Sequence, residues 1–501
     1  MRLSRLAHVE YKYLVALVFV FGLFMDLMDT TVVNVAVPAL SKEFSASTSA
    51  VEWTITGYLL SLAVFIPAAG WLSDRFGTKR TFMLAMAIFI LASAACGQAH
   101  SLEELIAFRF IQGIGGGMMT PVGTAMLSRE FPGAERAKAS AIISVPVVFA
   151  PTFGPVLGGY LIEYVSWRWI FYINLPIGIT GFIIAWQVLQ EHKEEYAQKG
   201  FDFWGLLLGG VSAASMLYAF NEASVYGWTS PRVLGFGIGG FVLMLLFAVL
   251  ELKVKFPILD LRLFKRWLFT AGNIMLIPAF GAFGGFLLLL TLFLQELQGY
   301  SALQAGLIQA PSTLGTAISL PLASRLYPRI GPRRMMIGGF FFSALFMLPF
   351  ITLQLDSPWW YVVALLVLRG LPFAFAVVAV QTIIYGPLES EKQGPASSIY
   401  NTLRQVAASF GVALIITIAL NRSHIYAHSH SQLQASVMGY HDAFFITFLV
   451  LLIPFFLSFT IDDRKAEETL RRREEAHVEE RREAVASPAA QLAEVRRHVE
   501  P

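Results

Sequence analysis

The chain contains a long series of apolar runs, each about as long as a membrane-crossing helix. A helix that spans a bilayer needs about 20 mostly apolar residues. Backbone N–H and C=O groups in lipid must be satisfied within their own segment, so these runs are predicted to be helices. The fourteen runs cover residues 14–38, 53–72, 82–98, 105–127, 139–161, 169–189, 204–220, 233–252, 267–294, 302–324, 335–353, 359–385, 397–420 and 444–460. The sequence therefore predicts an all-α membrane protein with fourteen transmembrane helices.

Composition and charge placement agree with a multi-pass membrane protein. Charged residues make up 14% of the chain and hydrophobic residues 56%, whereas soluble proteins carry roughly 25% charged residues. Most lysines and arginines between the runs fall in alternate loops, and the opposite loops hold only Lys42, Arg168, Arg232 and Arg422. By the positive-inside rule both termini are predicted to be cytoplasmic, in the cell (inner) membrane. The net charge of +3 therefore reflects topology and gives no indication of nucleic-acid binding.

Two carboxylates stand inside the first apolar run. Asp26 and Asp29 are three residues apart and share one helical face, and Arg109 lies within the fourth run. A charge at bilayer depth costs at least about 2.5 kcal/mol, so such residues are functional by default. Measured from the predicted outer helix ends, Asp29 lies about 13 Å deep and Arg109 about 6–9 Å deep, which permits pairing. Two acids for one arginine favour proton coupling over a fixed buried ion pair, because one acid can release a proton while the other stays paired.

Two parts of the sequence repeat each other. The stretch "GWLSDRFGTKR" (70–80) follows the second run, and a degraded copy, "SRLYPRIGPRR" (324–334), follows the tenth. The copy has Pro328 where the first stretch has Asp74. Internal repeats of membrane helices are typical of secondary transporters. The predicted domains are a six-helix N-terminal half at 1–190, two additional linker helices at 191–266, a six-helix C-terminal half at 267–461 and a charged cytoplasmic tail at 462–501.

Seven motifs occur along the chain in an order that a known transporter family shares. The first three are "GWLSDRFGTKR" itself, "RFIQGIGGG" (109–117) and "APTFGPVLGG" (150–159). They resemble the loop signature, the fourth-helix motif and the antiporter motif of the major facilitator superfamily. The other four resemble its fourteen-helix drug/proton antiporter branch; they are "MDTTVVNVAVP" (28–38), "WRWIFYINLPIG" (167–178), "LQGYSALQAGL" (297–307) and "NTLRQVAASFG" (401–411). The resemblance extends over nearly all of the chain from Leu14 to Thr460.

The resemblance implies roles for two of these motifs. It implies a cytoplasmic gate in the loop motif, formed by Gly70, Asp74, Arg75, Gly77, Lys79 and Arg80. Plain membrane anchoring is the alternative for the basic residues of that loop. The antiporter seam of the fifth helix would comprise Gly154, Pro155, Gly158 and Gly159. The spacing independently indicates close helix packing there, because small residues recur every four positions at 150, 154 and 158.

A substrate cavity is expected between the two halves, near the bilayer midplane. Its candidate lining residues are Trp53, Tyr58, Phe149, Phe153, Arg369, Asn401, Arg404 and Gln405. Aromatic rings with buried carboxylates suit lipophilic cations. The intramembrane arginines of this set would instead help to hold anionic or zwitterionic compounds, and the sequence leaves both possibilities open.

Other chemistries find little support. The only cysteine, Cys96, cannot form an intrachain disulfide, and no catalytic or metal site is predicted. His424, His428, His430 and His441 cluster near one end of the late helices, where a flexible polar loop is favoured over a metal site. The glycines of residues 113–117 lie in an apolar helix, and no Walker-type lysine follows any glycine loop. ATP is therefore not the expected energy source.

The expected function is proton-coupled antiport of amphipathic compounds or drugs out of the cell by alternating access. A dedicated exporter of one metabolite or antibiotic, with the same coupling, is the main alternative, and a membrane sensor or enzyme without transport is a remote one. No cofactor is expected, since the proton gradient supplies the energy. The expected partners are membrane lipid, small amphipathic substrates and protons, with no nucleic acid. The protein is expected to work as a monomer, and the sequence leaves a periplasmic adaptor open.

Overall fold

The computed structural model describes residues 10–131, 136–191, 200–388 and 390–462, and all the regular structure in those ranges is helical. The first bundle, called the N half, contains α1 (Tyr11–Glu43), α2 (Thr48–Val51), α3 (Trp53–Phe76), α4 (Thr78–Gly97), α5 (Leu102–Glu130), α6 (Arg136–Tyr164), α7 (Trp169–Tyr172) and α8 (Asn174–Val188). Two further helices follow, α9 (Phe203–Tyr226) and α10 (Pro231–Lys253). The tail from residue 463 onward lies outside the described residues.

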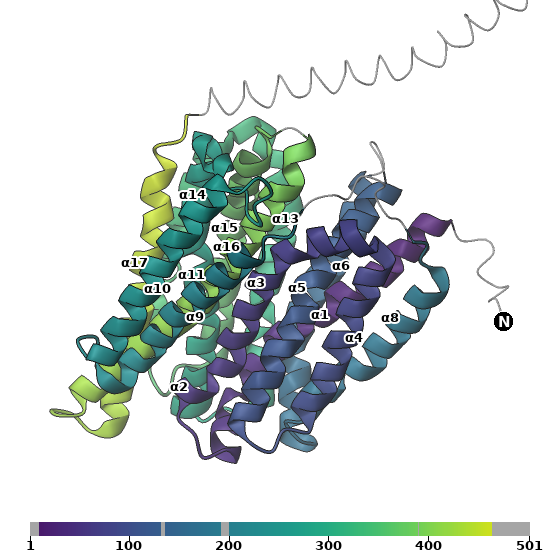
Figure 1. The fold of residues 1–501 in the computed structure, drawn as a ribbon. Coiled ribbons are helices and arrows are strands. Elements are labelled where there is room, and N and C mark those ends of the chain that lie inside the picture. The colour runs from purple at the N-terminus through teal and green to yellow at the C-terminus, as the bar shows by residue number, and fades with distance from the viewer. Residues whose placement is uncertain (1–9, 132–135, 192–199, 389, 463–501) are drawn as a thin grey trace, which may run out of the picture.

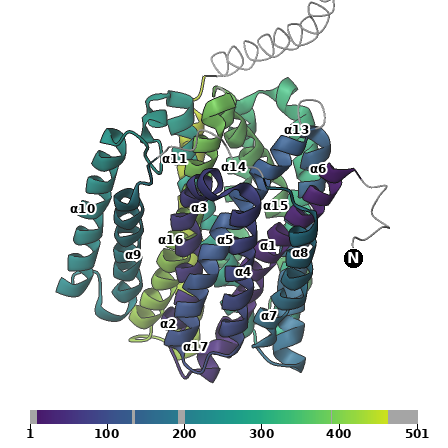
Figure 2. The same ribbon diagram turned by 45° about the vertical axis from the view of Figure 1, so that its right-hand side comes forward.

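The second bundle, called the C half, begins after the short helix η2 (Leu261–Lys265). Its elements are α11 (Trp267–Leu292), η3 (Phe293–Leu297), α12 (Ala302–Gln309), α13 (Pro311–Ile330), α14 (Pro332–Leu345), η4 (Leu348–Thr352), α15 (Trp359–Tyr385), α16 (Ser390–Tyr426) and α17 (Gln432–Ser458). Figures 1 and 2 show the two bundles side by side, with α9 and α10 standing together at one flank. The all-α fold class is confirmed for the described chain.

Each of the fourteen predicted runs falls on one of these helices or on a pair of consecutive ones. Eleven helical segments among the described residues are long and apolar enough to cross a membrane. In Figure 1 the described chain begins, at α1, and ends, after α17, at the same end of the bundle. A chain that crosses the membrane an even number of times has both of its ends on the same side. The count of fourteen crossings and the cytoplasmic placement of the termini stay predictions.

Serine side chains cap the N-termini of several helices. The hydroxyl oxygens of Ser47, Ser101, Ser230, Ser301 and Ser431 each accept a hydrogen bond from a backbone N–H in the first turn that follows. Such caps satisfy one of the N–H groups that a helix start leaves without a partner. The caps also explain one difference from the sequence prediction. The last helix starts at Gln432, twelve residues before the apolar run, because a capped polar stretch extends it.

Hydrogen bonds among the described residues join the two halves directly. Thr402 and Ser409 on α16 donate to the carbonyl oxygens of Ala63 and Thr56 on α3, over 3.3 and 3.1 Å. Thr152 and Thr313 share a hydrogen bond between α6 and α13, and Gln295 Nε2 donates to Val35 O over 3.1 Å. The halves therefore meet along α3 with α16, along α6 with α12 and α13, and at the contact of α1 with η3.

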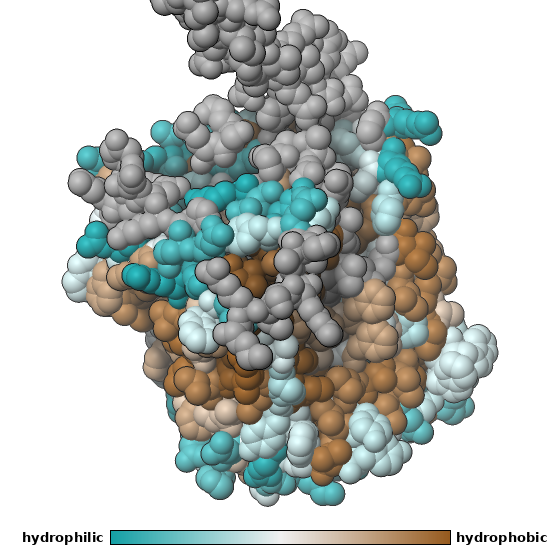
Figure 3. All heavy atoms as spheres, turned by 90° about the vertical axis from the view of Figure 1, so that its right-hand side faces the viewer, coloured by the Kyte–Doolittle hydropathy of each residue, from teal (hydrophilic) through white to brown (hydrophobic). Residues whose placement is uncertain are grey.

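The surface agrees with a membrane location. Figure 3 shows one face of the molecule, on which a broad hydrophobic band separates hydrophilic groups near the two ends. Many large apolar side chains of α8, α10 and α14 are exposed, for example Trp186, Phe241 and Phe342. In water such a surface would be a strong aggregation site, whereas lipid solvates it. The chain is therefore a membrane protein.

Candidate functional site

A closed ion pair lies inside the N half, between α1 and α5. Arg109 Nη1 is 2.5 Å from Asp29 Oδ2, and both residues are only 1% exposed. The pairing that the helix depths indicated is thus present in the structure. Burying a charge without a partner is very unfavourable, so each residue here is stabilised by the other.

Two amides and a carbonyl complete the hydrogen bonding of this pair. Gln112 Nε2 and Asn174 Nδ2 each donate to Asp29 Oδ1 over 2.9 Å. Arg109 also donates to Gln112 Oε1 over 2.8 Å and to Thr54 O over 2.9 Å. Sequence reasoning missed Gln112 and Asn174 as site residues. Gln112 could have been found, since it lies three residues after Arg109 on the same helical face, but nothing in the sequence joins Asn174 on α8 to this cluster.

The second carboxylate is held differently. Tyr58 on α3 donates its hydroxyl to Asp26 Oδ1 over 2.7 Å, and Thr120 on α5 donates to Asp26 Oδ2 over 3.4 Å. No ion pair within 4 Å involves Asp26 in the described chain, and the residue keeps 7% exposure. Arg404 on α16 lies within electrostatic range of Asp26 from the other half. The two acids thus share one helical face but have different partners.

Tyr58 connects the two acids. Its hydroxyl binds Asp26, and its ring lies 4.0 Å from the guanidinium carbon of Arg109, in a cation–π contact. We refer to Asp26, Asp29, Tyr58 and Arg109 as the acid cluster. The cluster holds two carboxylates and one guanidinium, so with both acids ionised its net charge is −1. Uptake of one proton makes it neutral, and this is a change that a membrane interior strongly favours.

The glycines of residues 113–117 bring the helices of the cluster together. A Cβ atom at Gly113 would lie 2.7 Å from Tyr58 O, and one at Gly117 would lie 2.8 Å from Leu62 O, both on α3. A Cβ atom at Gly115 would lie 2.6 Å from Ala85 O on α4. The run therefore serves helix packing, and this packing places Tyr58 against Arg109.

The loop motif forms a sharp turn between α3 and α4. Gly77 has φ 96° and ψ 151°, a conformation that is essentially restricted to glycine. Lys79 Nζ donates to the carbonyl oxygens of Trp186 and Leu189 over 2.9 and 2.5 Å, at the end of α8. A cation at that position complements the helix dipole. Glu191 accepts a hydrogen bond from Lys79 N and forms a 3.5 Å ion pair with Arg80.

The other gate candidates lie on the last turns of α3. Gly70 and Arg75 are exposed, and Asp74 is half-buried. The hydrogen bonds and the ion pair described for Lys79 and Arg80 all stay within the N half. In the C half, Gly331 has φ 83° and ψ 158° between α13 and α14, nearly the values of Gly77. The two copies of the loop sequence thus share one backbone turn.

The small residues of α6 pack against two different neighbours. A Cβ atom at Gly154 would collide with Thr31 Oγ1, and one at Gly158 would lie 2.9 Å from Val32 Cγ1, both on α1. A Cβ atom at Gly159 would collide with the backbone of Ala302 and Leu303 on α12.

Pro155 lies on the same side of α6 as Gly159. Its carbonyl faces Gly306 so closely that a Cβ atom there would collide with it. The predicted antiporter seam therefore contacts α1 within the N half and α12 across the junction between the halves.

The predicted cavity residues do not form one group. Trp53 is half-buried and contacts Tyr218 of α9, with ring centroids 6.4 Å apart. Phe149 and Phe153 stack on each other at 5.8 Å on an exposed side of α6. Asn401 Nδ2 bonds within its own helix, to Ser397 O at 2.9 Å.

Three further candidates lie in the C half. Gln405 on α16 is half-buried. Arg369 on α15 and Arg404 on α16 are both near a group of phenylalanine rings that involves α11. Of the eight cavity candidates, the structure places Tyr58 in the acid cluster and the two arginines beside this aromatic group.

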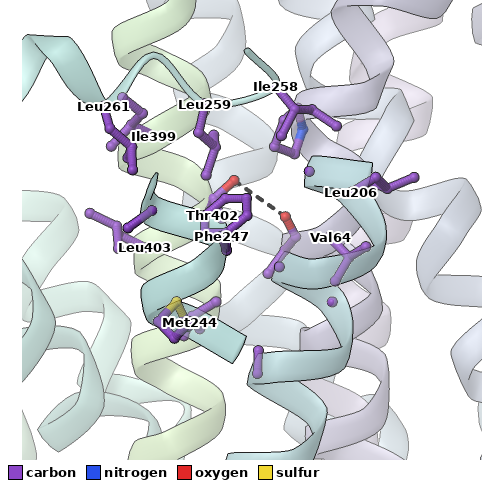
Figure 4. A pocket seen from close by; sticks show the side chains of 18 of the residues that line it. Val64, Leu206, Met244, Phe247, Ile258, Leu259, Leu261, Ile399, Thr402 and Leu403 are labelled. Atoms are coloured by element: carbon purple, nitrogen blue, oxygen red, sulfur yellow. Dashed lines mark hydrogen bonds between the residues drawn. The ribbon is translucent and has the colours of Figure 1, made fainter. Parts of the chain in front are cut away.

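A separate apolar pocket of about 200 Å³ lies beside the linker helices. Figure 4 shows Val64 of α3, Phe247 of α10 and Leu403 of α16 around it, with the hydrogen bond from Thr402 to Ala63 O nearby. Apart from Thr402 its side chains are apolar, so it offers few groups that could orient a polar ligand. None of the residues of the acid cluster lines it.

The histidine cluster does not form a metal site within the described chain. No group of three His, Cys, Asp or Glu side chains is placed to hold a metal ion there. His441 bonds Leu353 O at 2.6 Å, and His430 bonds the hydroxyl of Ser429 at 2.9 Å. His424 lines a cavity of about 440 Å³ together with Glu296 and Tyr440 at the ends of α16 and α17.

Comparison with known proteins gives consistent matches. The family model described as Major Facilitator Superfamily matches residues 19–412. A multidrug resistance protein B homolog of Mycobacterium tuberculosis is 34% identical over 80% of this chain and 75% of its own length. An MFS-type transporter of Bacillus subtilis, YhcA, is 30% identical over 91% of this chain and 93% of its own. The crystal structure of a D-xylose–proton symporter superposes with a TM-score of 0.63 at 17% identity, covering 91% of this chain and 99% of the symporter.

Proposed function

The chain belongs to the major facilitator superfamily, and we infer that it is a secondary active transporter that exchanges protons for amphipathic compounds, which it moves out of the cell. The relative named a multidrug resistance protein covers most of the chain, which supports drugs as one substrate class. The protein is a transporter and not an enzyme. The two halves act as the moving units of alternating access, and α9 and α10 as the linker between them.

The acid cluster carries this proposal. With both acids ionised, Asp29 is neutralised by Arg109, and the negative charge of Asp26 remains. One proton bound at either acid, or a cationic group of a substrate, can cancel this net charge of −1, but the two cannot do so together. Competition of this kind is sufficient for antiport, because the carrier then returns loaded with either substrate or proton.

We assign the first helix a division of labour. Asp29 holds the coupling proton when its bond to Arg109 opens, and Gln112 and Asn174 keep its carboxylate oriented while the pair is closed. Asp26, with its hydroxyl donors and its small residual exposure, meets the substrate. Tyr58 contacts both sites and transmits the state of one to the other.

The loop and the antiporter seam supply the moving parts of the proposal. The gate would use Asp74 and the basic residues up to Arg80 at the predicted cytoplasmic end of the N half. The seam at Gly159 and Pro155 would let α6 and α12 close tightly, so that protons do not leak between the halves. No cofactor takes part, and a monomer is sufficient for the cycle; a periplasmic adaptor would extend the export path without changing it.

Dye transport into inverted membrane vesicles tests the proposal. Energised vesicles that contain the full chain should accumulate an amphipathic dye, and an uncoupler should abolish the accumulation. Accumulation that persists without a proton gradient would exclude proton coupling. A panel of chemically unrelated dyes and drugs separates a multidrug exporter from a dedicated one, because the latter would transport one compound and ignore the others.

A further inference from the structure

A second buried arginine, in the C half, lacks the acid partner that Arg109 has. Arg369 is 6% exposed and lies ten residues after the start of α15, or about 15 Å along the helix, close to the middle of a 30 Å hydrocarbon layer. Its Nε is buried without an acceptor. No hydrogen bond or ion pair joins it to any other described residue. A guanidinium in this setting is a strong candidate for binding an anion from outside the chain.

Aromatic rings hold this arginine in place. Its guanidinium carbon lies 4.0 Å from the ring centroid of Phe286 and 5.7 Å from that of Phe283, both on α11. Phe286 is buried, and its ring packs on the rings of Phe350 and Phe444. Phe283, three residues earlier, is 36% exposed. The arginine is therefore buried on one side and adjoins an exposed ring on the other.

The rings continue from Arg369 to a second arginine. Phe283 stacks on Phe373 with centroids 5.6 Å apart, and Phe373 contacts Phe280 at 6.1 Å. Arg404 lies 5.9 Å from the ring of Phe280, and it too forms no ion pair or hydrogen bond with the rest of the described chain. We refer to these five side chains as the arginine–phenylalanine group. It combines two unpaired guanidinium groups with a row of three rings.

The arginine–phenylalanine group faces the acid cluster at one point. Arg404 lies within electrostatic range of Asp26 across the junction between the halves. A positive region of the C half thus lies opposite the negative region of the N half. The two regions are complementary to a molecule that has an acidic group at one end and a basic group at the other.

We propose that the arginine–phenylalanine group binds the acidic end of an aromatic zwitterion. The carboxylate or sulfonate of the substrate pairs with Arg369, whose guanidinium fork offers parallel N–H donors. Arg404, at the other end of the row of rings, adds a second positive charge that attracts the same acidic group. Its ring system stacks on Phe283, and its cationic group replaces the proton at the acid cluster. The proposal rests on the antiport function inferred above and narrows its substrate class.

A pair of dyes tests the proposal directly. Rhodamine 110 has a free carboxylate and is a zwitterion, whereas rhodamine 123 is its methyl ester and a cation. Binding to the purified full chain is measured by fluorescence polarisation, without any proton gradient. We expect rhodamine 110 to bind about tenfold more tightly, the effect of one hydrogen-bonded charge pair. Equal affinities for the two dyes, or tighter binding of the ester, would overturn the proposal with no variant needed.

Variants then locate the effect. Arg369→Gln and Arg404→Gln should each weaken rhodamine 110 binding and leave rhodamine 123 nearly unchanged, while Arg369→Lys should restore part of the difference. Arg232→Gln on α10 removes an exposed arginine and serves as the matched control. If the preference for rhodamine 110 survives in both glutamine variants, the assigned arginines are wrong.

Transport of the same dyes tests the antiport function separately from the zwitterion site. In proteoliposomes, dye movement that ignores the proton gradient would contradict the antiport function. The affinity ratio of the two dyes would still decide whether the arginine–phenylalanine group recognises an acidic end. Conversely, gradient-driven transport of both dyes with equal affinities would keep the antiport function and reject the zwitterion site.

Discussion

The hydroxyl of Tyr58 donates a 2.7 Å hydrogen bond to the carboxylate of Asp26. The ring of the same tyrosine covers the guanidinium of Arg109, which is paired with Asp29. A change at either acid therefore reaches the other through one rigid side chain. This relationship explains how two carboxylates that lie one helical turn apart can act as one unit and still have different partners.

Replacing Tyr58 with phenylalanine tests this connection. Tyr58→Phe keeps the ring over Arg109 and removes only the hydroxyl. The hydrogen bond to Asp26 is lost with it, and a hydrogen bond to a charged acceptor is worth about 1.5–3 kcal/mol. We expect efflux to fall by about tenfold or more, with protein yield close to that of the parent. The control is Tyr440→Phe, since Tyr440 donates to Glu296 over 3.3 Å outside the acid cluster. Similar losses in the two variants would show that the connection has no special role.

The cytoplasmic gate makes a prediction about asymmetry. If Asp74 stabilises one conformation of the carrier, Asp74→Asn should reduce transport while membrane insertion and dye binding stay near the parent values. Replacement of Pro328, which occupies the corresponding place in the second copy of the loop sequence, should matter less because that copy has no acid. Transport rates in vesicles, normalised to protein amount, provide the measurement. A parental rate in Asp74→Asn would reject the gate assignment.

The turn between α3 and α4 offers a matched pair of glycine variants. Gly77→Ala puts a residue with a side chain into a backbone conformation that costs about 1–3 kcal/mol. The added methyl group would also collide with the side chain of Glu191. A Cβ atom at Gly70, about two turns earlier in α3, would meet nothing within 4 Å, so Gly70→Ala is the matched control. Thermal unfolding in detergent should therefore show a lower midpoint for Gly77→Ala than for Gly70→Ala, which should unfold like the parent. Gly331→Ala should behave like Gly77→Ala, because it has the same turn geometry; a neutral result there would argue against equivalent turns.

The seam between the halves can be separated from packing within one half. Gly159→Ala places a methyl group against the backbone of α12, which cannot rotate away, whereas Gly154→Ala meets the side chain of Thr31. We expect Gly159→Ala to retain dye binding and lose most transport, with a leak of protons through vesicles that contain it. Gly154→Ala should keep a larger share of the transport rate. Equal effects of the two would mean that the seam is ordinary packing.

Much of the fold could be predicted from the sequence because lipid imposes so strict a rule on the backbone. Every apolar run had to become a helix, and each one did. The helix ends were less predictable, since polar capped turns such as the one at Ser431 extend a helix beyond its apolar part. The sequence also showed that Asp29 and Arg109 could pair, because depth along two helices can be counted from their ends.

The surroundings of that pair could not be predicted. Asn174 reaches Asp29 only because α8 packs beside α1, and no local pattern encodes which helices are neighbours. Trp53 illustrates the same limit, since it contacts α9 and not the acid cluster. Unlike buried apolar positions, polar contacts between distant helices depend on the rotation of each helix about its axis, and a sequence pattern fixes that rotation only coarsely.

Neutralising the residues of the first helix one at a time tests the division of labour between the two acids. Asp29→Asn should abolish proton-driven efflux, because an amide cannot take up and release the coupling proton. Asp26→Asn should change the substrate range or the pH optimum more than the coupling. Arg109→Ala should be worse than either, since it leaves two acids without their buried cation; both would then stay protonated, and the carrier would bind substrate without completing a cycle. Substrate-induced proton release from each purified variant is the measurement, with Asp442→Asn on α17 as the control at an exposed ion pair. Parental release from Asp29→Asn but not from Asp26→Asn would reverse the two roles, and parental release from both would place the coupling site outside this helix.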